Sequence, residues 1–322
     1  MKHKVLVLGK IHQAGLDLLK NYDHFDLILD DDKPKNILDI TKDVNAIIVR
    51  MTPINKELIK NSKNLKIVSR HGVGYNTVNV EELSSRNIPL TITEDVNSTA
   101  VSEHAFGMMI GFSKFLIRHD NSVRNENFKI RDEYNSFELK DKKILIIGFG
   151  RIGRKFANLC ENFGMEVLIA DKFINKSSIE KKYKFSNNFE DFINEADFIS
   201  LHSPHEPNSP PMFSKEQFLK MKNNSVIINT SRGDLINELD LVEALKNQII
   251  GGACLDVFNP EPPSVENNEL LKLDNVILSP HSAAYTKEAI KKMSISCCQN
   301  VIDYFEGNIK KDLVVNFNKI KI

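Results

Sequence analysis

The sequence has no net charge, few cysteines and no long apolar run, and each of these absences excludes a class of protein. Its 43 lysine and arginine residues balance 43 aspartate and glutamate residues. A chain without excess positive charge offers no broad surface for nucleic acid or for an anionic membrane, so we expect neither partner. No apolar run approaches the roughly 20 residues of a membrane span. The opening MKHKVLVLG is too short in apolar residues for a signal peptide, and we expect it to form a first strand.

The four cysteines do not have the spacing of a disulfide framework. Cys297 and Cys298 are adjacent on an expected helix, Cys160 lies on another expected helix, and Cys254 lies on an expected strand. Such a set is typical of a reducing compartment, and we expect a cytoplasmic protein.

A chain of 322 residues exceeds the size at which one hydrophobic core keeps growing, so we expect two domains. Short apolar stretches alternate with helical stretches along almost the whole chain. The strands that this pattern predicts are residues 4–8, 25–29, 46–49, 65–69, 89–93, 144–147, 166–170, 197–201, 225–229, 251–257 and 275–279. The alternation predicts an α/β fold with two doubly wound parallel-sheet domains.

A glycine fingerprint begins near the middle of the chain. The apolar strand at 144–147 is followed by Gly148, Gly150 and Gly153 in the order G-x-G-x-x-G, and then by apolar residues at helical spacing. Asp171 ends the next strand, 23 residues after Gly148. Strand, glycine turn, helix, strand and acid are the parts of a dinucleotide site, with the pyrophosphate at the helix N-terminus. No Gly-Lys-Ser or Gly-Lys-Thr follows the glycines, which excludes a nucleotide-triphosphatase phosphate loop.

Because so much of the chain precedes the fingerprint, we expect another domain to be built first. A long apolar helix is expected from near Asn97, with its stripe at Val101, Ala105, Met108, Met109, Phe112, Phe115 and Leu116. We expect residues 1–97 and 286–322 to form a substrate-binding domain, into which a dinucleotide-binding domain of residues 98–285 is inserted. A small-molecule site is expected between two such domains.

Three polar residues follow predicted strands of the inserted domain. Arg232 follows one strand, Glu261 lies in a proline-rich turn after the next, and His281 follows the last. Ligands of open α/β sheets bind at the carboxyl ends of the strands. There a histidine is suited to move a proton, a carboxylate to orient it, and an arginine to bind a substrate carboxylate. Taken singly, each is more often a surface or turn residue.

The segments GFGRIG, INTSRGDLIN, LDVFNPEPP and LSPHSAAYTKEA together resemble the D-isomer-specific 2-hydroxyacid dehydrogenases. Within that family the resemblance is closest to short 3-phosphoglycerate dehydrogenases that lack a regulatory domain, so serine feedback through such a domain is not expected. The resemblance implies a catalytic set of Arg232, Glu261 and His281. It also implies an NAD-binding Rossmann domain inserted into a discontinuous flavodoxin-like domain, and a homodimer joined through the NAD-binding domains.

The resemblance also implies the NAD site, with Asp256 near the nicotinamide amide. The implied residues are Gly148, Gly150, Arg151, Ile152, Gly153, Asp171, His202, Thr230 and Asp256. Asp171 is expected to bind the ribose hydroxyls and to repel a 2′-phosphate. His202 and His205 have the spacing H-x-x-H but no further ligands follow, so no metal is expected.

For the substrate, RHGVGYN resembles the glycine turn of the family, whose N–H groups at Val73 and Gly74 are implied to hold a carboxylate. Arg50 and Arg70 follow strands where the phosphoglycerate branch has phosphate-binding arginines, although each alone is as readily a surface charge. We expect oxidation of 3-phosphoglycerate to 3-phosphohydroxypyruvate. Reduction of glyoxylate or hydroxypyruvate is the alternative within the family, and an NAD-binding sensor or corepressor is the alternative outside catalysis.

The chain departs from the family pattern in three places. Asn76, Thr77 and Asn79 follow the glycine turn where the family commonly has an acidic residue. After LHSP the chain has HEPNSPPMF where the family has a threonine-rich loop near the adenine, which leaves the adenine contacts open. Ser282 follows His281 where an apolar residue is usual.

Overall fold

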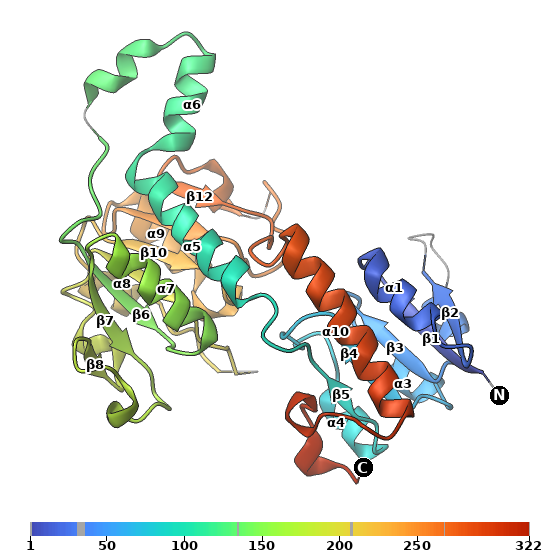
Figure 1. The fold of residues 1–322 in the computed structure, drawn as a ribbon. Coiled ribbons are helices and arrows are strands. Elements are labelled where there is room, and N and C mark those ends of the chain that lie inside the picture. Colours follow the sequence, from blue (N-terminus) through green and yellow to red (C-terminus); the bar gives the residue numbers. More distant parts are fainter. Residues whose placement is uncertain (1, 31–35, 134, 207–208, 267, 322) are drawn as a thin grey trace. The chain divides into compact units, whose positions relative to one another are not determined.

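The computed structural model describes residues 2–30, 36–133, 135–206, 209–266 and 268–321 (Figure 1). Pro207 and Asn208 of the segment HEPNSPPMF lie outside the described residues. The chain divides into two compact units. The first consists of residues 1–97 and 285–322, and the second of residues 98–284. Each unit has its own parallel sheet covered by helices, which confirms the predicted fold class.

The first unit has a five-stranded sheet in the order β2-β1-β3-β4-β5, all pairs parallel. Its strands are β1 (His3–Leu8), β2 (Phe25–Leu29), β3 (Ala46–Val49), β4 (Ile67–Arg70) and β5 (Leu90–Thr91). Its helices are α1 (Gln13–Lys20), α2 (Ile37–Thr41), α3 (Lys56–Asn61), α4 (Val80–Ser85) and α10 (Lys287–Phe305), with short 3-10 turns η6 (Lys311–Leu313) and η7 (Phe317–Lys319). This strand order is the flavodoxin-like one, which reverses direction between β1 and β3.

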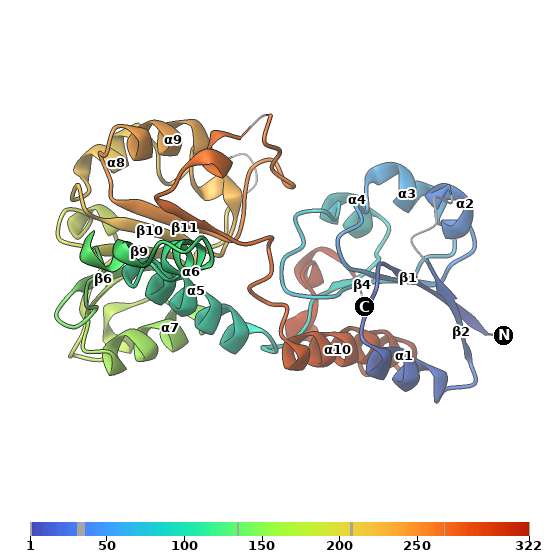
Figure 2. The same cartoon turned by 90° about the horizontal axis from the view of Figure 1, so that it is seen from above.

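Helices cover both faces of this sheet, with α2, α3 and α4 on one face and α1 and α10 on the other (Figure 2). Leu58, Ile59 and Leu83 bury the first face, while Leu19 and Val301 bury the second. Both faces are covered, so the strands read as continuous apolar runs rather than as alternating ones.

The second unit has a seven-stranded parallel sheet in the order β12-β11-β10-β9-β6-β7-β8. Its strands are β6 (Lys143–Ile147), β7 (Glu166–Ala170), β8 (Lys184–Ser186), β9 (Phe198–Leu201), β10 (Val226–Asn229), β11 (Gly252–Leu255) and β12 (Val276–Leu278). Its helices are α5 (Ser98–Ser113), α6 (Leu116–Arg124), α7 (Arg151–Asn162), α8 (Lys215–Lys220) and α9 (Glu238–Lys246). The 3-10 turns are η1 (Phe128–Glu133), η2 (Lys176–Ser178), η3 (Phe189–Asp191), η4 (Gly233–Leu235) and η5 (Glu269–Lys272).

The central strand β6 pairs Ile144 with Val167 of β7 on one side and with Phe198 of β9 on the other. Helices α5 and α7 cover one face of this sheet, and α8 and α9 cover the other (Figure 2). Phe156 is fully buried on the first face and Phe218 on the second. The order of the strands reverses between β6 and β9, and the glycine turn follows β6 directly.

The long apolar helix expected from Asn97 is shorter than its stripe of residues. Helix α5 ends at Ser113, and Phe115 has a left-handed backbone with a φ of 52°. A left-handed residue cannot continue a right-handed helix. The inclusion of Phe115 and Leu116 was therefore wrong, because Leu116 begins α6 and is 53% exposed. Two short elements, α2 and β8, carry too little periodicity to be expected from the sequence.

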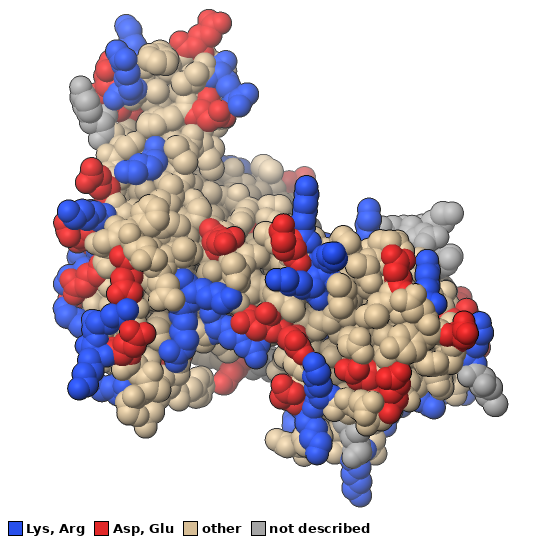
Figure 3. Space-filling view, viewed as in Figure 1, with Lys and Arg blue, Asp and Glu red and all other residues tan. Residues whose placement is uncertain are grey.

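Charges of both signs are interspersed over most of the face that Figure 3 shows. Among the described residues, no helix combines the length and apolar character that crossing a membrane requires.

Asn316 attaches the end of the chain to β5 in the first unit. Its buried side chain accepts a hydrogen bond from the Leu90 N–H (2.9 Å) and donates to the Ile88 carbonyl (3.0 Å) and the Ser84 hydroxyl (3.1 Å). One amide thus binds polar groups of α4, of the segment before β5 and of β5 itself, which has only two residues in the sheet.

We predict that Asn316→Ala lowers the free energy of unfolding by about 1–3 kcal/mol, because the buried Leu90 N–H loses its acceptor. Urea denaturation followed by circular dichroism measures the change. Asn318→Ala, at an exposed position two residues further on, is the matched control and should have little effect. Equal stability of the two variants would contradict this account of the C-terminal attachment.

Candidate functional site

The glycine turn after β6 is shaped by two close backbone approaches. Gly148 has a φ of 93°, and a Cβ there would lie 2.7 Å from the backbone of His202. A Cβ on Gly153 would lie 2.1 Å from the Gly148 carbonyl oxygen. A Cβ on Gly150, by contrast, would meet nothing within 4 Å. The first and third glycines are therefore required by the protein itself, whereas the middle glycine leaves open space at the N-terminus of α7.

Asp171, directly after β7, holds this turn from the side. Its carboxylate accepts hydrogen bonds from the N–H groups of Phe149 (2.8 Å), Phe173 (2.8 Å) and Ile174 (3.2 Å). A carboxylate has about four acceptor positions, so one is left for a further donor such as a hydroxyl. The first N–H groups of α7, including those of Arg151 and Ile152, have no acceptor within the helix. This arrangement fits a dinucleotide whose pyrophosphate lies at the helix N-terminus.

His202 and Thr230 lie at the carboxyl ends of β9 and β10, the edge where the glycine turn also lies. The His202 ring packs on Phe156 (5.0 Å between ring centroids) and its Nε2 is 2.9 Å from the Ser200 hydroxyl. Burial lowers the pKa of His202 to about 3. Thr230 has a buried hydroxyl with no partner among the described residues. An unsatisfied buried hydroxyl is costly without a partner, which fits a bound group at this edge.

Two of the three predicted catalytic residues are in direct contact. The His281 Nδ1 lies 2.8 Å from Glu261 Oε2, while Glu261 Oε1 accepts a hydrogen bond from the Phe258 N–H (2.9 Å). Because the carboxylate can only accept, Nδ1 donates, and Nε2 is the nitrogen left to exchange a proton with a ligand. The His281 side chain remains 40% exposed.

Burial acts to raise the pKa of Glu261, but hydrogen bonds from His281 and from Phe258 outweigh it, so this pKa lies below its usual value. Burial also lowers the pKa of Arg232, against the opposing charges of Glu261 and Asp234. An arginine stays protonated in either case. Glu261 is therefore a carboxylate in contact with the histidine and within the electrostatic reach of the guanidinium.

A close crossing of two segments brings Arg232 toward Glu261. A Cβ on Gly233 would lie 2.1 Å from the Phe258 carbonyl oxygen, so only glycine permits the turn of residues 258–261 to pass there. Asn229, at the end of β10, stabilises the turn of residues 229–232. Its side chain donates to the Arg232 carbonyl (2.8 Å) and accepts from the Ser231 N–H (3.0 Å).

Asp256 comes directly after β11 and is buried. Its carboxylate is fully buried and accepts hydrogen bonds from the N–H groups of Ser282 (2.8 Å) and Ala283 (2.9 Å) and from the Ser279 hydroxyl (2.5 Å). These bonds hold the loop that carries His281. Contact with a nicotinamide amide stays a prediction.

In the first unit, Arg50 follows β3 at the point where the strand order reverses, which is where sheets of this type bind ligands. Its Nε is 3.0 Å from the Tyr285 hydroxyl, its guanidinium carbon is 4.6 Å from the centre of that ring, and its Nη1 donates to the Lys10 carbonyl (3.1 Å). Tyr285 was not singled out from the sequence, since a lone tyrosine far away in the chain gives no signal.

Arg70 is the last residue of β4, and its guanidinium binds neighbouring carbonyl groups. Its Nη1 donates to the carbonyls of His71 (2.5 Å) and Val49 (3.4 Å). Burial and the neighbouring charges of Arg70 and Arg50 lower the pKa of His71 to about 4. In the following glycine turn, no hydrogen bond from the Val73 or Gly74 N–H is found among the described residues.

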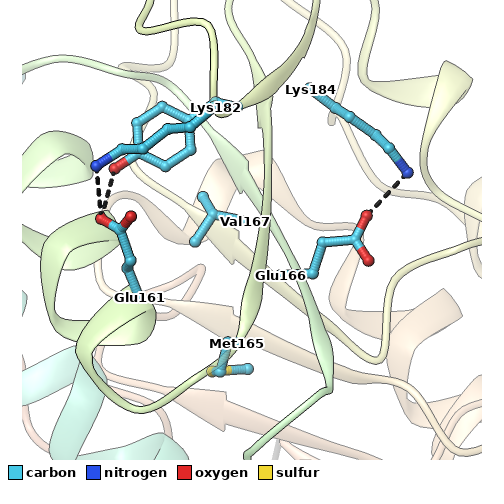
Figure 4. Close-up of a pocket in the computed structure, with 7 residues that line it drawn as sticks. Glu161, Met165, Glu166, Val167, Lys182 and Lys184 are labelled. Atoms are coloured by element: carbon cyan, nitrogen blue, oxygen red, sulfur yellow. Dashed lines mark hydrogen bonds and ion pairs between the residues drawn. The ribbon is translucent and has the colours of Figure 1, made fainter.

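A separate pocket of about 330 Å³ lies beside β7 and is drawn in Figure 4. Glu161 pairs there with Lys182 (2.9 Å), and Glu166 pairs with Lys184 (2.8 Å). Glu166 is the first residue of β7, so this pocket lies at the amino end of the strand, opposite the glycine turn. Its charges satisfy one another, and we assign it no part in binding the dinucleotide. Among the described residues, no cluster of His, Cys, Asp and Glu has the geometry of a metal site.

Residues 106–283 match the family model described as "D-isomer specific 2-hydroxyacid dehydrogenase, NAD binding domain". The chain is 32% identical to a glyoxylate reductase of Thermococcus litoralis, over 98% of this chain and 97% of that protein. It is 31% identical to a D-3-phosphoglycerate dehydrogenase of Methanocaldococcus jannaschii, over 97% of this chain but only 59% of that longer protein.

Solved structures share the fold across both units. An NADPH-dependent glyoxylate/hydroxypyruvate reductase from Sinorhizobium meliloti superposes with a TM-score of 0.81 and 26% identity, covering 94% of this chain and 95% of that one. An NAD-dependent formate dehydrogenase from Staphylococcus aureus, solved with NAD, has a TM-score of 0.86 at 24% identity, covering 97% and 98%. The second of these likenesses concerns the fold alone.

The glycine turn yields a prediction that separates folding from binding. Gly150→Ala should leave the melting temperature unchanged, because its methyl group meets open space, yet weaken NAD binding by about tenfold or more by filling the space that the pyrophosphate needs. Gly148→Ala should lower the melting temperature, because it combines a positive φ with a 2.7 Å contact. Calorimetric NAD titration and thermal unfolding of both variants measure the two effects. Tight NAD binding by Gly150→Ala would refute the assignment of the turn.

Proposed function

The chain belongs to the D-isomer specific 2-hydroxyacid dehydrogenase family, and from that premise we propose that it oxidises 3-phosphoglycerate to 3-phosphohydroxypyruvate. It is an NAD-dependent oxidoreductase, and the second unit is its NAD-binding domain. The observation that carries the catalytic part of the proposal is the 2.8 Å contact of His281 with Glu261, with Arg232 beside them.

Bound NAD supplies the nicotinamide that accepts a hydride from the substrate or returns one to it. His281 takes the hydroxyl proton at Nε2 during oxidation and gives it back during reduction. Glu261 keeps Nδ1 protonated, orients the ring and stabilises the positive charge that the imidazole gains. Arg232 binds the substrate carboxylate and stabilises negative charge on the reacting oxygen.

The substrate assignment rests on residues of the first unit. The Val73 and Gly74 N–H groups are proposed to bind the carboxylate together with Arg232. Arg50 and Arg70 are proposed to bind the phosphate, since a dianion gains most from two guanidinium groups. The arrangement of Arg50 supports this, because Tyr285 holds the guanidinium in place without neutralising its charge.

Reduction of glyoxylate or hydroxypyruvate is the second candidate. It is favoured by the relatives named glyoxylate reductase, which this chain matches over nearly their whole length. Nicotinamide absorbance with 3-phosphoglycerate, hydroxypyruvate and glyoxylate, each with NAD and NADP, distinguishes the candidates. Binding of NAD without turnover of any such acid would favour a sensor instead.

We also propose a homodimer formed through the second unit. Helix α6 and η1 extend away from the sheet of that unit (Figure 1). Most of their apolar side chains are exposed, Ile130 excepted. Leu116 and Ile117 are each 53% exposed and Phe128 is 64% exposed. A second copy of the chain is the occupant that would bury them. The four buried, free cysteines support a cytoplasmic location.

His281→Ala should lower kcat by roughly 10²–10⁴-fold, the usual contribution of a general acid–base group, while NAD affinity is retained. Glu261→Gln should lower kcat less than His281→Ala does. The amide oxygen still accepts a hydrogen bond from Nδ1, although it lacks the charge that stabilises the protonated imidazole. Steady-state kinetics and NAD titration measure both effects. His24→Ala, at an exposed histidine of the first unit, is the matched control. Normal turnover by His281→Ala would refute the proposed chemistry.

Arg50→Ala should lower kcat/KM for 3-phosphoglycerate by about one to two decades, as expected for the loss of a charge-assisted hydrogen bond. The same variant should barely change kcat/KM for glyoxylate, which has no second anionic group. Lys63→Ala removes an exposed charge elsewhere in the first unit and controls for net charge. Equal losses on both substrates would remove Arg50 from the phosphate site and leave the reductase candidate.

A further inference from the structure

The main chain and the side chain of Asp256 both hold the loop that carries His281. The Asp256 carbonyl accepts a hydrogen bond from the His281 N–H (2.8 Å), and its carboxylate binds the next two N–H groups, those of Ser282 and Ala283. Asp256 comes directly after β11, so the loop is fixed to a rigid strand end.

This attachment holds His281 in a backbone conformation that few non-glycine residues adopt. Its φ is 50°, in the left-handed region. Such a residue persists only where the surroundings impose it, and it is found preferentially at functional sites. The bonds to Asp256 supply that constraint, so the direction in which the imidazole points depends on the placement of the Asp256 carboxylate.

His104, in the middle of α5, reaches this carboxylate through Ser279. Its Nε2 lies 2.9 Å from the Ser279 hydroxyl and 3.5 Å from Asp256 Oδ1. The hydroxyl has a single proton and donates it to Asp256 at 2.5 Å. It must therefore accept from His104, which assigns the proton of His104 to Nε2.

Helix α5 thereby contributes a donor to Ser279, whose hydroxyl in turn donates to the fully buried Asp256 carboxylate. A buried carboxylate is costly unless hydrogen-bond donors surround it. In a chain of hydrogen bonds each bond polarises the next, so the bond from His104 strengthens the one that Ser279 donates to Asp256. His104 does not touch His281, Glu261 or Arg232 in any hydrogen bond of the described residues.

We propose that His104 is a positioning residue, which acts through Ser279 and Asp256 to hold the loop of residues 279–283 and thus to orient His281. The consequence for turnover rests on the proposed role of His281, whereas the consequence for the loop does not.

The test therefore has one readout that requires no substrate. In His104→Leu, hydrogen exchange of peptides covering residues 279–284 should become about fivefold faster, the change expected when one hydrogen bond of a local structure is lost. His104→Gln, whose amide N–H can occupy the place of Nε2–H, should restore the slow exchange. Glu103→Leu, the neighbouring exposed residue of α5, is the matched control. Unchanged exchange in His104→Leu would overturn the proposal, whatever the substrate of the protein.

The second readout is the division between kcat and KM. His104→Leu should lower kcat by roughly tenfold, because a misplaced catalytic group slows the reaction, with KM for NAD unchanged. His104→Gln should recover most of that loss. If His104→Leu folds poorly, Ser279→Ala breaks the same chain of bonds at its middle and should give both effects. A wild-type kcat in His104→Leu and in Ser279→Ala, in a protein that turns over a 2-keto acid, would refute the positioning role and leave the proposed function intact.

Discussion

Parallel pairing of every strand in the second unit is the constraint on which the site depends. Because all seven strands run in one direction, residues that follow β6, β9, β10, β11 and β12 emerge at one edge of the sheet. Gly148, His202, Arg232, Asp256 and His281 are such residues, although they span more than a hundred positions of the chain. An antiparallel strand among them would send its following residues to the opposite edge.

At this edge, backbone geometry and electrostatics work together. Gly148, Gly153 and Gly233 permit approaches that any side chain would block, and these approaches bring the turns into contact. Three carboxylates then hold these turns in place. Asp171 binds the glycine turn, Glu261 binds the imidazole of His281, and Asp256 binds the loop that carries His281. Each of these carboxylates accepts at least two hydrogen bonds from N–H donors, which offsets the cost of placing its negative charge there.

The first unit also has a parallel sheet whose strand order reverses, but a different group lies at that point. Its strand order reverses between β1 and β3, and Arg50 lies at that point. There Tyr285 and the Lys10 carbonyl hold the guanidinium, and no negative group among the described residues forms an ion pair with it. A cation held by neutral partners still attracts an anion. For this reason we propose that Arg50 binds the phosphate and so distinguishes a phosphorylated acid from a smaller one.

The sequence by itself determined the fold class, the glycine turn and the identity of the polar residues after the strands, because apolar runs, glycines and spacing are local properties. The apolar stripe predicted that the helix α5 continues to Leu116, whereas it ends at Ser113. The left-handed backbone at Phe115 depends on packing that no local sequence pattern shows. The sequence also gave no sign that Tyr285 would lie on Arg50 or that His104 would reach Ser279 and Asp256. Tyr285 is 235 residues from Arg50, and His104 is 175 residues from Ser279. Only the tertiary structure decided these contacts, because hydrogen bonds between distant residues exist only once the strands and helices that carry them have packed.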